Sequence, residues 1–303
     1  MNCQIKFPSV WVDASALENV LRSGYGPHRP DVYEVSFVFP RGCNIMVDTA
    51  VRLLSLSNQL DYRTCRVCLN FEEGETGTMG YLDRMGFFNH LSKNVEVLPA
   101  RPVVSGVEIY GGTNADLVEI TRINREYRDE QLPTLLTEAV MRSCCDRVDA
   151  GELRGAAWTI FAELIDNIFS HSKTPLDGYA VLQPYSQGHR LKVAVSDSGL
   201  GIMDTLRPSL KNEFPALDKL SDTDLLVEVF RQGLSRHGAD RGYGLKGCAA
   251  KAIKYNADLD VRLPTTRVLL SPGKEGYRPN TAYSYDNLPL LWGTHICFTF
   301  HLD

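Results

Sequence analysis

Residues 158–171 have the sequence WTIFAELIDNIFSH, with the periodicity of an amphipathic helix. Glu163 and Asn167 are four residues apart, so they lie one turn from each other on the same side of this helix. A carboxylate that can polarise water, beside an amide oxygen that can bind a hard cation, is what Mg²⁺-nucleotide chemistry needs. Taken alone the pair is weak evidence, because most exposed Glu and Asn residues on such helices are simply solvated. The apolar face of the helix comprises Ile160, Phe161, Leu164, Ile165 and Ile168.

A second group of polar residues and glycines follows a predicted strand, in the sequence VAVSDSGLGI of residues 193–202. Gly199 and Gly201 allow positive φ and a close approach of the backbone to a flat ligand. An ionised Asp197 can accept a hydrogen bond from an exocyclic amine. An ordinary Asp/Gly turn at the end of a strand is the alternative interpretation of this segment by itself.

The third group is DRGYGLKG, residues 240–247, which opens a helix predicted over about residues 244–256. Glycines at a helix N-terminus leave backbone N–H groups free to hold phosphate. The segment is not a Walker loop, since GxxxxGK[ST] is absent. Its Gly242, Gly244 and Gly247 also lack the β-α-β unit and downstream acidic residue of a dinucleotide-binding fingerprint. By itself this group is more typical of a plain helix start.

Together and in this order, the three groups resemble the ATP-binding domain of the GHKL superfamily, which includes gyrase, the heat-shock chaperone, histidine kinases and MutL. Residues 163–167 match the N box, 197–201 the DxGxG box and 242–245 the second glycine box. The sequence GTHI of residues 293–296 resembles the final G-T box, in which a Thr supports the adenine-binding Asp. The resemblance covers about residues 150–303. It implies the Bergerat fold, an α+β two-layer sandwich with helices on a mixed sheet.

The resemblance implies a role for each matching residue. Glu163 would be the catalytic residue that activates the attacking nucleophile, and Asn167 would bind Mg²⁺ through its side-chain oxygen. Asp197 would recognise the adenine amine, Gly199 and Gly201 would line the adenine pocket, and the amides near Gly244 would hold the phosphates. The full set implied to contact the cofactors ATP and Mg²⁺ is Asn167, Asp197, Gly199, Gly201, Ile202, Arg241, Gly242, Tyr243, Gly244, Leu245, Lys246 and Thr294.

Residues 203–241, between the adenine box and the phosphate box, would form an ATP lid. Proline and glycine residues interrupt the segment, so we expect it to bury little surface on its own and to become ordered on ATP binding. Ser221 is expected to cap a short helix within it. Arg236, Arg241 and Lys246 are candidate phosphate or lid cations, with plain solvation as the alternative. The breaks are expected at Pro208, Pro215, Gly233 and Gly238.

Within the superfamily the chain is most similar to the compact anti-sigma-factor-type serine kinases, whose N boxes likewise have Glu-x-x-x-Asn with a nearby His. No phosphoacceptor His followed by an acidic residue and Pro precedes the ATP domain, which argues against a sensor histidine kinase. His171 is therefore expected to be a packing residue. The sequences VCLNF (67–71) and TGTMGYL (76–82) resemble a divergent STAS domain. The Asp-Ser-Ser-Gly acceptor of that family is absent, and Thr78 is only a weak candidate for phosphorylation.

The first third of the chain alternates predicted strands and helices. The strands are expected at 35–39, around 67 and at 95–98, and the helices at 44–60, capped by Asn44, and at 79–91. This β-α-β-α-β order predicts a small, mostly parallel sheet with helical cover. We therefore predict a STAS-like α/β domain over residues 1–110 and the ATP-binding domain over residues 115–303.

Composition excludes several classes of protein. The 303 residues suffice for two domains, and a net charge of −5 without a basic tract argues against direct nucleic-acid binding. The chain has no apolar run near the roughly 18 residues that span a bilayer, so we expect a cytoplasmic protein that does not bind membranes. Among its eight cysteines only Cys65 and Cys68 have metal or redox spacing. They would point to opposite faces of a strand, which favours reduced thiols.

Two functions fit these observations. The first is a Mg²⁺-dependent enzyme that hydrolyses ATP or transfers its γ-phosphate to a protein hydroxyl, with Glu163 as general base. The second is a nucleotide-gated interaction switch with little or no catalysis. The presence of both Glu163 and Asn167 favours the enzyme, because a pure binder needs no base. A regulatory protein partner is expected, whereas its identity, the phosphoacceptor and a homodimeric state are left open.

Overall fold

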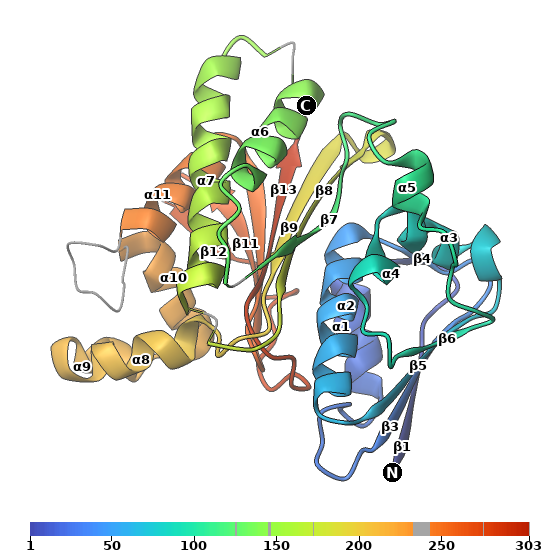
Figure 1. Ribbon diagram of the computed structural model, residues 1–303. Coiled ribbons are helices and arrows are strands. Elements are labelled where there is room, and N and C mark those ends of the chain that lie inside the picture. Colours follow the sequence, from blue (N-terminus) through green and yellow to red (C-terminus); the bar gives the residue numbers. More distant parts are fainter. Residues whose placement is uncertain (125, 145–146, 172, 233–242, 275, 303) are drawn as a thin grey trace.

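The computed structural model describes residues 1–124, 126–144, 147–171, 173–232, 243–274 and 276–302. Its N-terminal third forms a parallel four-stranded sheet with helices, and the rest forms an antiparallel seven-stranded sheet with helices (Figure 1). Between them, the connector predicted around residues 101–114 contains one short helix, α5 (Gly106–Tyr110). The coarse expectation of an α/β part followed by an α+β part is confirmed.

The parallel sheet has the strand order β1-β3-β5-β6. The predicted β-α-β-α-β order is confirmed, and a further strand and helix, β1 and α1, precede it. A two-stranded ladder pairs β2 with β4. The bounds are β1 (Asn2–Lys6), β2 (Trp11–Val12), α1 (Ala14–Ser23), β3 (Glu34–Phe39), β4 (Asn44–Ile45), α2 (Val47–Tyr62), β5 (Arg66–Phe71), η1 (Gly74–Thr76), α3 (Thr78–Arg84), α4 (Phe87–His90) and β6 (Glu96–Leu98).

Two local predictions in this part are wrong. Helix α2 has Met46 at its N-cap, because Asn44 instead pairs with Trp11 in the β2–β4 ladder. The helix predicted over 79–91 is two helices, because Gly86 adopts a φ of +78° between them. The Thr78 side chain is buried and its hydroxyl donates to the carbonyl of Cys43, so this candidate phosphorylation site is covered.

The seven-stranded sheet has the order β12-β11-β10-β13-β9-β8-β7, and all pairings between these strands are antiparallel. The prediction of a mixed sheet is therefore wrong for the described residues. Short connections join β8 to β9 and β10 through β12, and such connections produce antiparallel neighbours. Strand β12 was not predicted. The bounds are β7 (Val118–Ile123), β8 (Gly178–Tyr185), η2 (Ser186–Gly188), β9 (Arg190–Ser196), β10 (Ala257–Arg262), β11 (Arg267–Gly273), β12 (Gly276–Pro279) and β13 (His295–His301).

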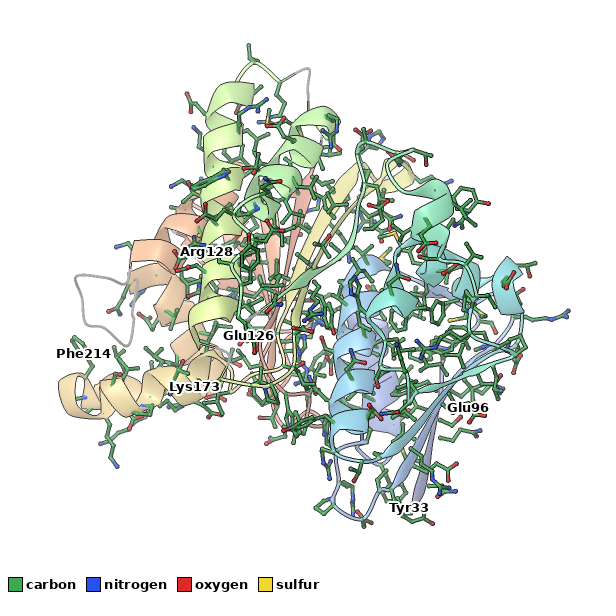
Figure 2. The ribbon with its side chains drawn as sticks, in the orientation of Figure 1. Tyr33, Glu96, Glu126, Arg128, Lys173 and Phe214 are labelled. Carbon is green, nitrogen blue, oxygen red and sulfur yellow. The ribbon has the colours of Figure 1, made fainter. Side chains whose placement is uncertain are left out.

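Helices cover one face of this sheet, and two further helices extend away from it (Figure 1). The covering helices are α6 (Leu132–Ser143), α7 (Ala150–His171), α10 (Asp222–Gln232) and α11 (Tyr243–Lys254). The extending helices are α8 (Ile202–Glu213) and α9 (Pro215–Asp218). Figure 2 shows the exposed Phe214 at the outer end of α8.

The segment predicted as a lid is largely helical over residues 203–232. Pro208 lies inside α8 without ending it. Ser221 caps α10 as predicted, since its Oγ accepts a hydrogen bond from the Asp224 N–H at 3.0 Å. The segment does not stand on its own in the fold, because α10 packs against α11 and β12. Its buried residues are Leu225, Leu226, Val229 and Phe230.

The N-terminal part covers the second face of the seven-stranded sheet, so the predicted two-layer sandwich is incomplete. Helix α2 packs against β8 and β9, and Figure 1 shows α1 and α2 between the two sheets. Strand β9 is consequently buried on both faces. Val193 and Val195 belong to the core beneath α7, whereas Ala194 belongs to the core that contains α2. The two parts of the chain thus share buried surface along β9.

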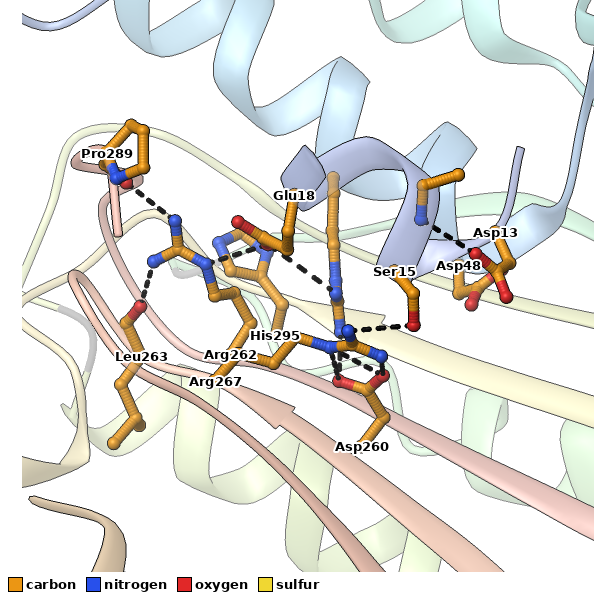
Figure 3. A network of polar contacts seen from close by, with 12 residues as sticks. Asp13, Ser15, Glu18, Asp48, Asp260, Arg262, Leu263, Arg267, Pro289 and His295 are labelled. Carbon is orange, nitrogen blue, oxygen red and sulfur yellow. Dashed lines mark hydrogen bonds and ion pairs between the residues drawn. The ribbon is translucent and has the colours of Figure 1, made fainter. Parts of the chain in front are cut away.

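The contact between the two parts contains buried charges (Figure 3). Asp260 of β10 accepts hydrogen bonds from Arg52 of α2 at 2.8 Å and from Arg267 of β11 at 3.0 Å. Arg262 of β10 donates to Glu18 of α1 at 2.8 Å. Burial by itself would raise the pKa of Asp260, but the guanidinium groups of Arg52 and Arg267 hold that pKa well below its usual range. Each of these charges depends on partners from the neighbouring element, since little solvent reaches them.

The described cysteines are free thiols. Cys65 is buried just before β5 and Cys68 is half-buried on the other face of that strand, as the spacing predicted. Within the described residues, none of the helices is both long and apolar enough to cross a membrane.

Candidate adenine and phosphate site

Asp197 lies at the end of β9, where it is held by the backbone of two loops. Its N–H donates to the Thr294 carbonyl at 3.0 Å, which continues the pairing of β9 with β13 by one residue. The Oδ1 atom accepts from the Gly199 N–H at 2.6 Å, and Oδ2 accepts from the Thr294 N–H at 3.2 Å. The carboxylate is therefore fixed by backbone amides from both sides.

The carboxylate of Asp197 is buried, and no cation from the described residues lies beside it. Burial raises the pKa of this carboxyl to about 6, against the opposing effect of the Gly199 and Thr294 N–H groups. Alternation along an extended strand places Asp197 on the same face as Val193 and Val195, the face covered by α7. A buried carboxylate of this kind is stabilised by a ligand that donates hydrogen bonds to it.

The loops around Asp197 require glycine at two positions. Gly201 has a φ of +84°, and a Cβ there would come within 3.0 Å of Pro264. Gly293 has a φ of +95°, and a Cβ there would overlap the Asp197 backbone and lie 2.7 Å from its Oδ1. Thr294 joins the two loops, because its Oγ1 accepts from the Ile202 N–H at 3.2 Å. The structure thus brings Asp197, Gly199, Gly201, Ile202 and Thr294 together as the sequence pattern predicted.

Glu163 and Asn167 lie on α7 as one half-buried pair. The Asn167 Nδ2 is 3.4 Å from Glu163 Oε1, and the Asn167 Oδ1 has no hydrogen-bond donor among the described residues. Burial raises the pKa of Glu163, and the nearby Asp166 adds to this, while the contact with Asn167 opposes it. Asp166 itself forms an ion pair at 3.0 Å with Arg128, whose side chain is labelled in Figure 2. The pair therefore combines a carboxylate with raised pKa and an amide oxygen that accepts no hydrogen bond from the described residues.

The start of α11 lies directly against this pair. A Cβ added to Gly244 would overlap the Glu163 carboxylate, so any residue other than glycine at this position would displace the carboxylate. A second contact connects the pair with the Asp197 loops. Gly178 is so close to Ile168 and to the Ser196 carbonyl that a Cβ there would lie 2.9 Å and 3.1 Å from them. Residues adjacent to Asn167 and to Asp197 are therefore neighbours, and both groups lie at one end of the sheet.

Not every residue predicted to contact nucleotide faces the end of the sheet where Glu163 and Asp197 lie. Lys246 lies two residues, and so about 200°, around α11 from Gly244. Its side chain lines a hollow of about 160 Å³ together with Phe230 of α10 and Tyr277 of β12. Leu245 is half-buried against the core. Arg236, Arg241 and Gly242, together with the side chains of His171 and Tyr243, lie outside the described residues.

One residue outside the sequence motifs, Gln59, holds these loops from the other face of the sheet. The side-chain amide of Gln59 on α2 contacts Ser198, next to Asp197, and Trp292, two residues before Thr294. Gln59 is completely buried. The only signal in the sequence is a polar side chain on one face of a helix, and such a face normally meets solvent.

The donor set fits Mg²⁺ only in combination with a phosphate ligand. Among the described residues, there is no cluster of three or more His, Cys, Asp or Glu side chains that could hold a metal ion alone. Mg²⁺ commonly binds through one or two protein oxygens together with substrate phosphates and water. The Oδ1 of Asn167, which has no donor among the described residues, could be such an oxygen. Comparison of the chain with protein-family models and with curated proteins finds no match.

Proposed function

We propose that this chain binds Mg-ATP with a site of the GHKL type and uses Glu163 to hydrolyse ATP or to transfer its γ-phosphate to a protein hydroxyl. The observation that carries the proposal is the buried carboxylate of Asp197, which has backbone donors on both sides and, within the described part of the chain, no cation beside it. An exocyclic amine of adenine would supply the donor that this carboxylate lacks.

In this proposal each loop has one task. Asp197 accepts the hydrogen bond from adenine, and the glycine backbone at Gly199 and Gly201 allows the flat base to approach. The start of α11 at Gly244 presents free N–H groups to the phosphates. Asn167 contributes its Oδ1 to Mg²⁺, which when bound neutralises charge on the phosphates.

Glu163 would act as the general base in turnover. Its raised pKa makes the carboxylate a stronger base for removing the proton of a hydroxyl group or a water molecule. The contact with Gly244 places the carboxylate at the helix end that would hold phosphate. This favours an enzyme over the alternative, a switch that binds nucleotide with little catalysis.

The N-terminal part would then be the regulatory element. The same proposal includes a STAS-like identity for this part, a cytoplasmic location and a protein partner. Support comes from the direct packing of α2 on β8 and β9, because this contact connects the N-terminal part to the strand that ends at Asp197.

Isothermal titration calorimetry with ATP tests the binding proposal. Asp197→Asn keeps the shape of the side chain but removes its charge, and should weaken ATP binding by about ten- to a hundredfold. GTP should bind poorly to the parent, because its carbonyl would face the carboxylate. Asp204→Asn, in the exposed first turn of α8, is the matched control and should bind ATP like the parent. Equal ATP affinity of the folded Asp197→Asn variant and the parent would refute the proposed site.

A further inference from the structure

The side-chain amide of Gln59 uses all of its hydrogen-bonding capacity. Its Nε2 donates to Ser198 Oγ at 2.9 Å and to the Trp292 carbonyl at 3.0 Å. Its Oε1 accepts from the Trp292 N–H at 3.0 Å and lies 3.1 Å from His28 Nε2. Two donor and two acceptor positions are the full capacity of an amide. A fully satisfied buried amide defines a single arrangement of the groups around it.

The His28 ring supports this arrangement from the N-terminal side. Burial lowers the pKa of His28 to about 4, so the ring is neutral at physiological pH. The Nδ1 atom lies 3.3 Å from Arg63 Nη1, which can only donate, so Nδ1 accepts and the proton is assigned to Nε2. His28 therefore donates to Gln59 Oε1, and its ring also packs on Trp292 with centroids 4.9 Å apart.

The two loops that Gln59 holds are the same two loops that frame Asp197. Ser198 directly follows Asp197, and its side chain meets α2, on the face opposite to the one that Asp197 occupies. Trp292 is followed by Gly293 and Thr294, whose backbone contacts the Asp197 carboxylate. A displacement of either loop would change the position of this carboxylate relative to a bound base.

We infer that Gln59 is a positioning residue for the adenine-recognising carboxylate, so that helix α2 of the N-terminal part completes the nucleotide site from behind. This inference rests on the proposed function. It extends that function by assigning base selectivity partly to a residue more than a hundred positions away from the ATP-binding motifs. Gln59 does not contact the nucleotide and acts through Ser198 and Trp292.

The neighbouring residue on α2 provides a matched control. Asn58 is also a buried amide that joins the N-terminal part to the antiparallel sheet, since its Nδ2 donates to the Tyr179 hydroxyl at 2.9 Å. Its other contacts are the His90 carbonyl and the Ser92 N–H, which belong to the N-terminal part. Loss of Asn58 removes a buried amide from the same helix without touching the loops that frame Asp197.

The experiment measures the affinities of the full chain for ATP and for ITP, which has a carbonyl in place of the adenine amine. Gln59→Leu should weaken ATP binding by about tenfold and ITP binding much less, so the preference for ATP should fall. Asn58→Leu should leave this preference unchanged, even where both variants lose thermal stability. Ser198→Ala removes one acceptor of Gln59 and should lower the preference by a smaller factor, which keeps the inference testable where Gln59→Leu does not fold.

A double-substitution cycle separates this inference from the proposed function. In an Asp197→Asn background, Gln59→Leu should change ATP affinity much less than it does in the parent. The positioning role would be overturned if Gln59→Leu changed ATP affinity equally in both backgrounds. It would also be overturned if Asn58→Leu changed the preference for ATP over ITP as much as Gln59→Leu does. Neither result would contradict ATP binding itself. An Asp197→Asn variant with the parent's preference for ATP over ITP would instead refute the proposed function itself.

Discussion

Gly244 at the start of α11 is in direct contact with the carboxylate of Glu163 on α7, and a Cβ at residue 244 would overlap that carboxylate. The contact places an acidic group at a helix N-terminus, where the helix dipole stabilises negative charge. It also leaves a space at Gly244 that no larger residue can occupy without moving Glu163. The position of the Glu163 carboxylate and the packing of α11 on α7 are therefore coupled at a single glycine.

Gly244→Ala should abolish most ATP turnover while leaving the protein folded. The added methyl group displaces the end of a flexible side chain rather than backbone, so the strain is small but Glu163 loses its position. The matched control is Gly247→Ala in the same helix, where a Cβ would meet nothing within 4 Å. That variant should keep full turnover and gain up to about 1 kcal/mol of stability from helix propensity. Phosphate-release assays and urea unfolding of both variants test this, and parent-like turnover in Gly244→Ala would contradict it.

Glu163→Ala and Asn167→Ala should separate chemistry from metal binding. Glu163→Ala should retain ATP affinity and lose turnover by roughly 10²- to 10⁴-fold, the usual contribution of a general base. Asn167→Ala should instead reduce the effect of Mg²⁺ on ATP affinity. Calorimetry with and without Mg²⁺, together with phosphate release, distinguishes the two variants. Undiminished turnover in Glu163→Ala would favour the nucleotide-gated switch.

The unfolding free energy should depend on pH through Asp197. In the folded protein the pKa of Asp197 is about 6, above its usual value near 3.8. The protonated carboxyl therefore favours the folded state. Its stabilising contribution is fully present below about pH 4 and is lost as the pH rises through about 6. The total change amounts to about 3 kcal/mol, since one pKa unit corresponds to about 1.4 kcal/mol.

Asp197→Asn should remove this contribution. The stability of the variant relative to the parent should rise between pH 4 and pH 7, whereas Asp204→Asn should follow the parent. Urea unfolding at several pH values measures the difference. Parallel stability curves for the parent and Asp197→Asn would show that this carboxyl titrates normally. In the proposed site adenine donates to the ionised carboxylate, so ATP affinity should also fall as the pH is lowered through about 6.

Asp260→Asn should strongly destabilise the protein. The substitution leaves the guanidinium groups of Arg52 and Arg267 buried without their anion, and loss of one partner of such a buried group typically costs about 3–5 kcal/mol. The pKa of Asp260 is held low in the folded state, so its contribution is present above about pH 4 and is lost as the pH falls further. Asp31→Asn, in an exposed pair with Arg29, is the control and should not change stability measurably. Thermal unfolding at neutral pH measures the stability of the two variants and of the parent.

Most secondary structure and the adenine loops could be predicted because their signals are local. The alternation of Leu191, Val193 and Val195 identified β9, and glycine at residues 201 and 293 occurs where the backbone has positive φ. The failure at Asn44, by contrast, has a non-local cause. Asn44 was a reasonable cap by residue type, but its pairing with Trp11 depends on a segment more than 30 residues away.

The sequence by itself determined the order of the motifs and the residues around Asp197, because chain-local spacing places those residues on adjacent loops. Only the tertiary structure determines which residues pack against these loops from the other face of the sheet. Asp48, Arg52, Ser55 and Gln59 recur at helical spacing, and such a polar face ordinarily meets water. Here it meets the second face of an antiparallel sheet, where Lys192, Asp260 and Ser198 are the partners of Asp48, Arg52 and Gln59. The buried Ser55 hydroxyl has no hydrogen-bond partner among the described residues. A polar stripe in the sequence indicates only that its polar groups need hydrogen-bonding partners. The fold determines whether those partners are water molecules or another part of the chain.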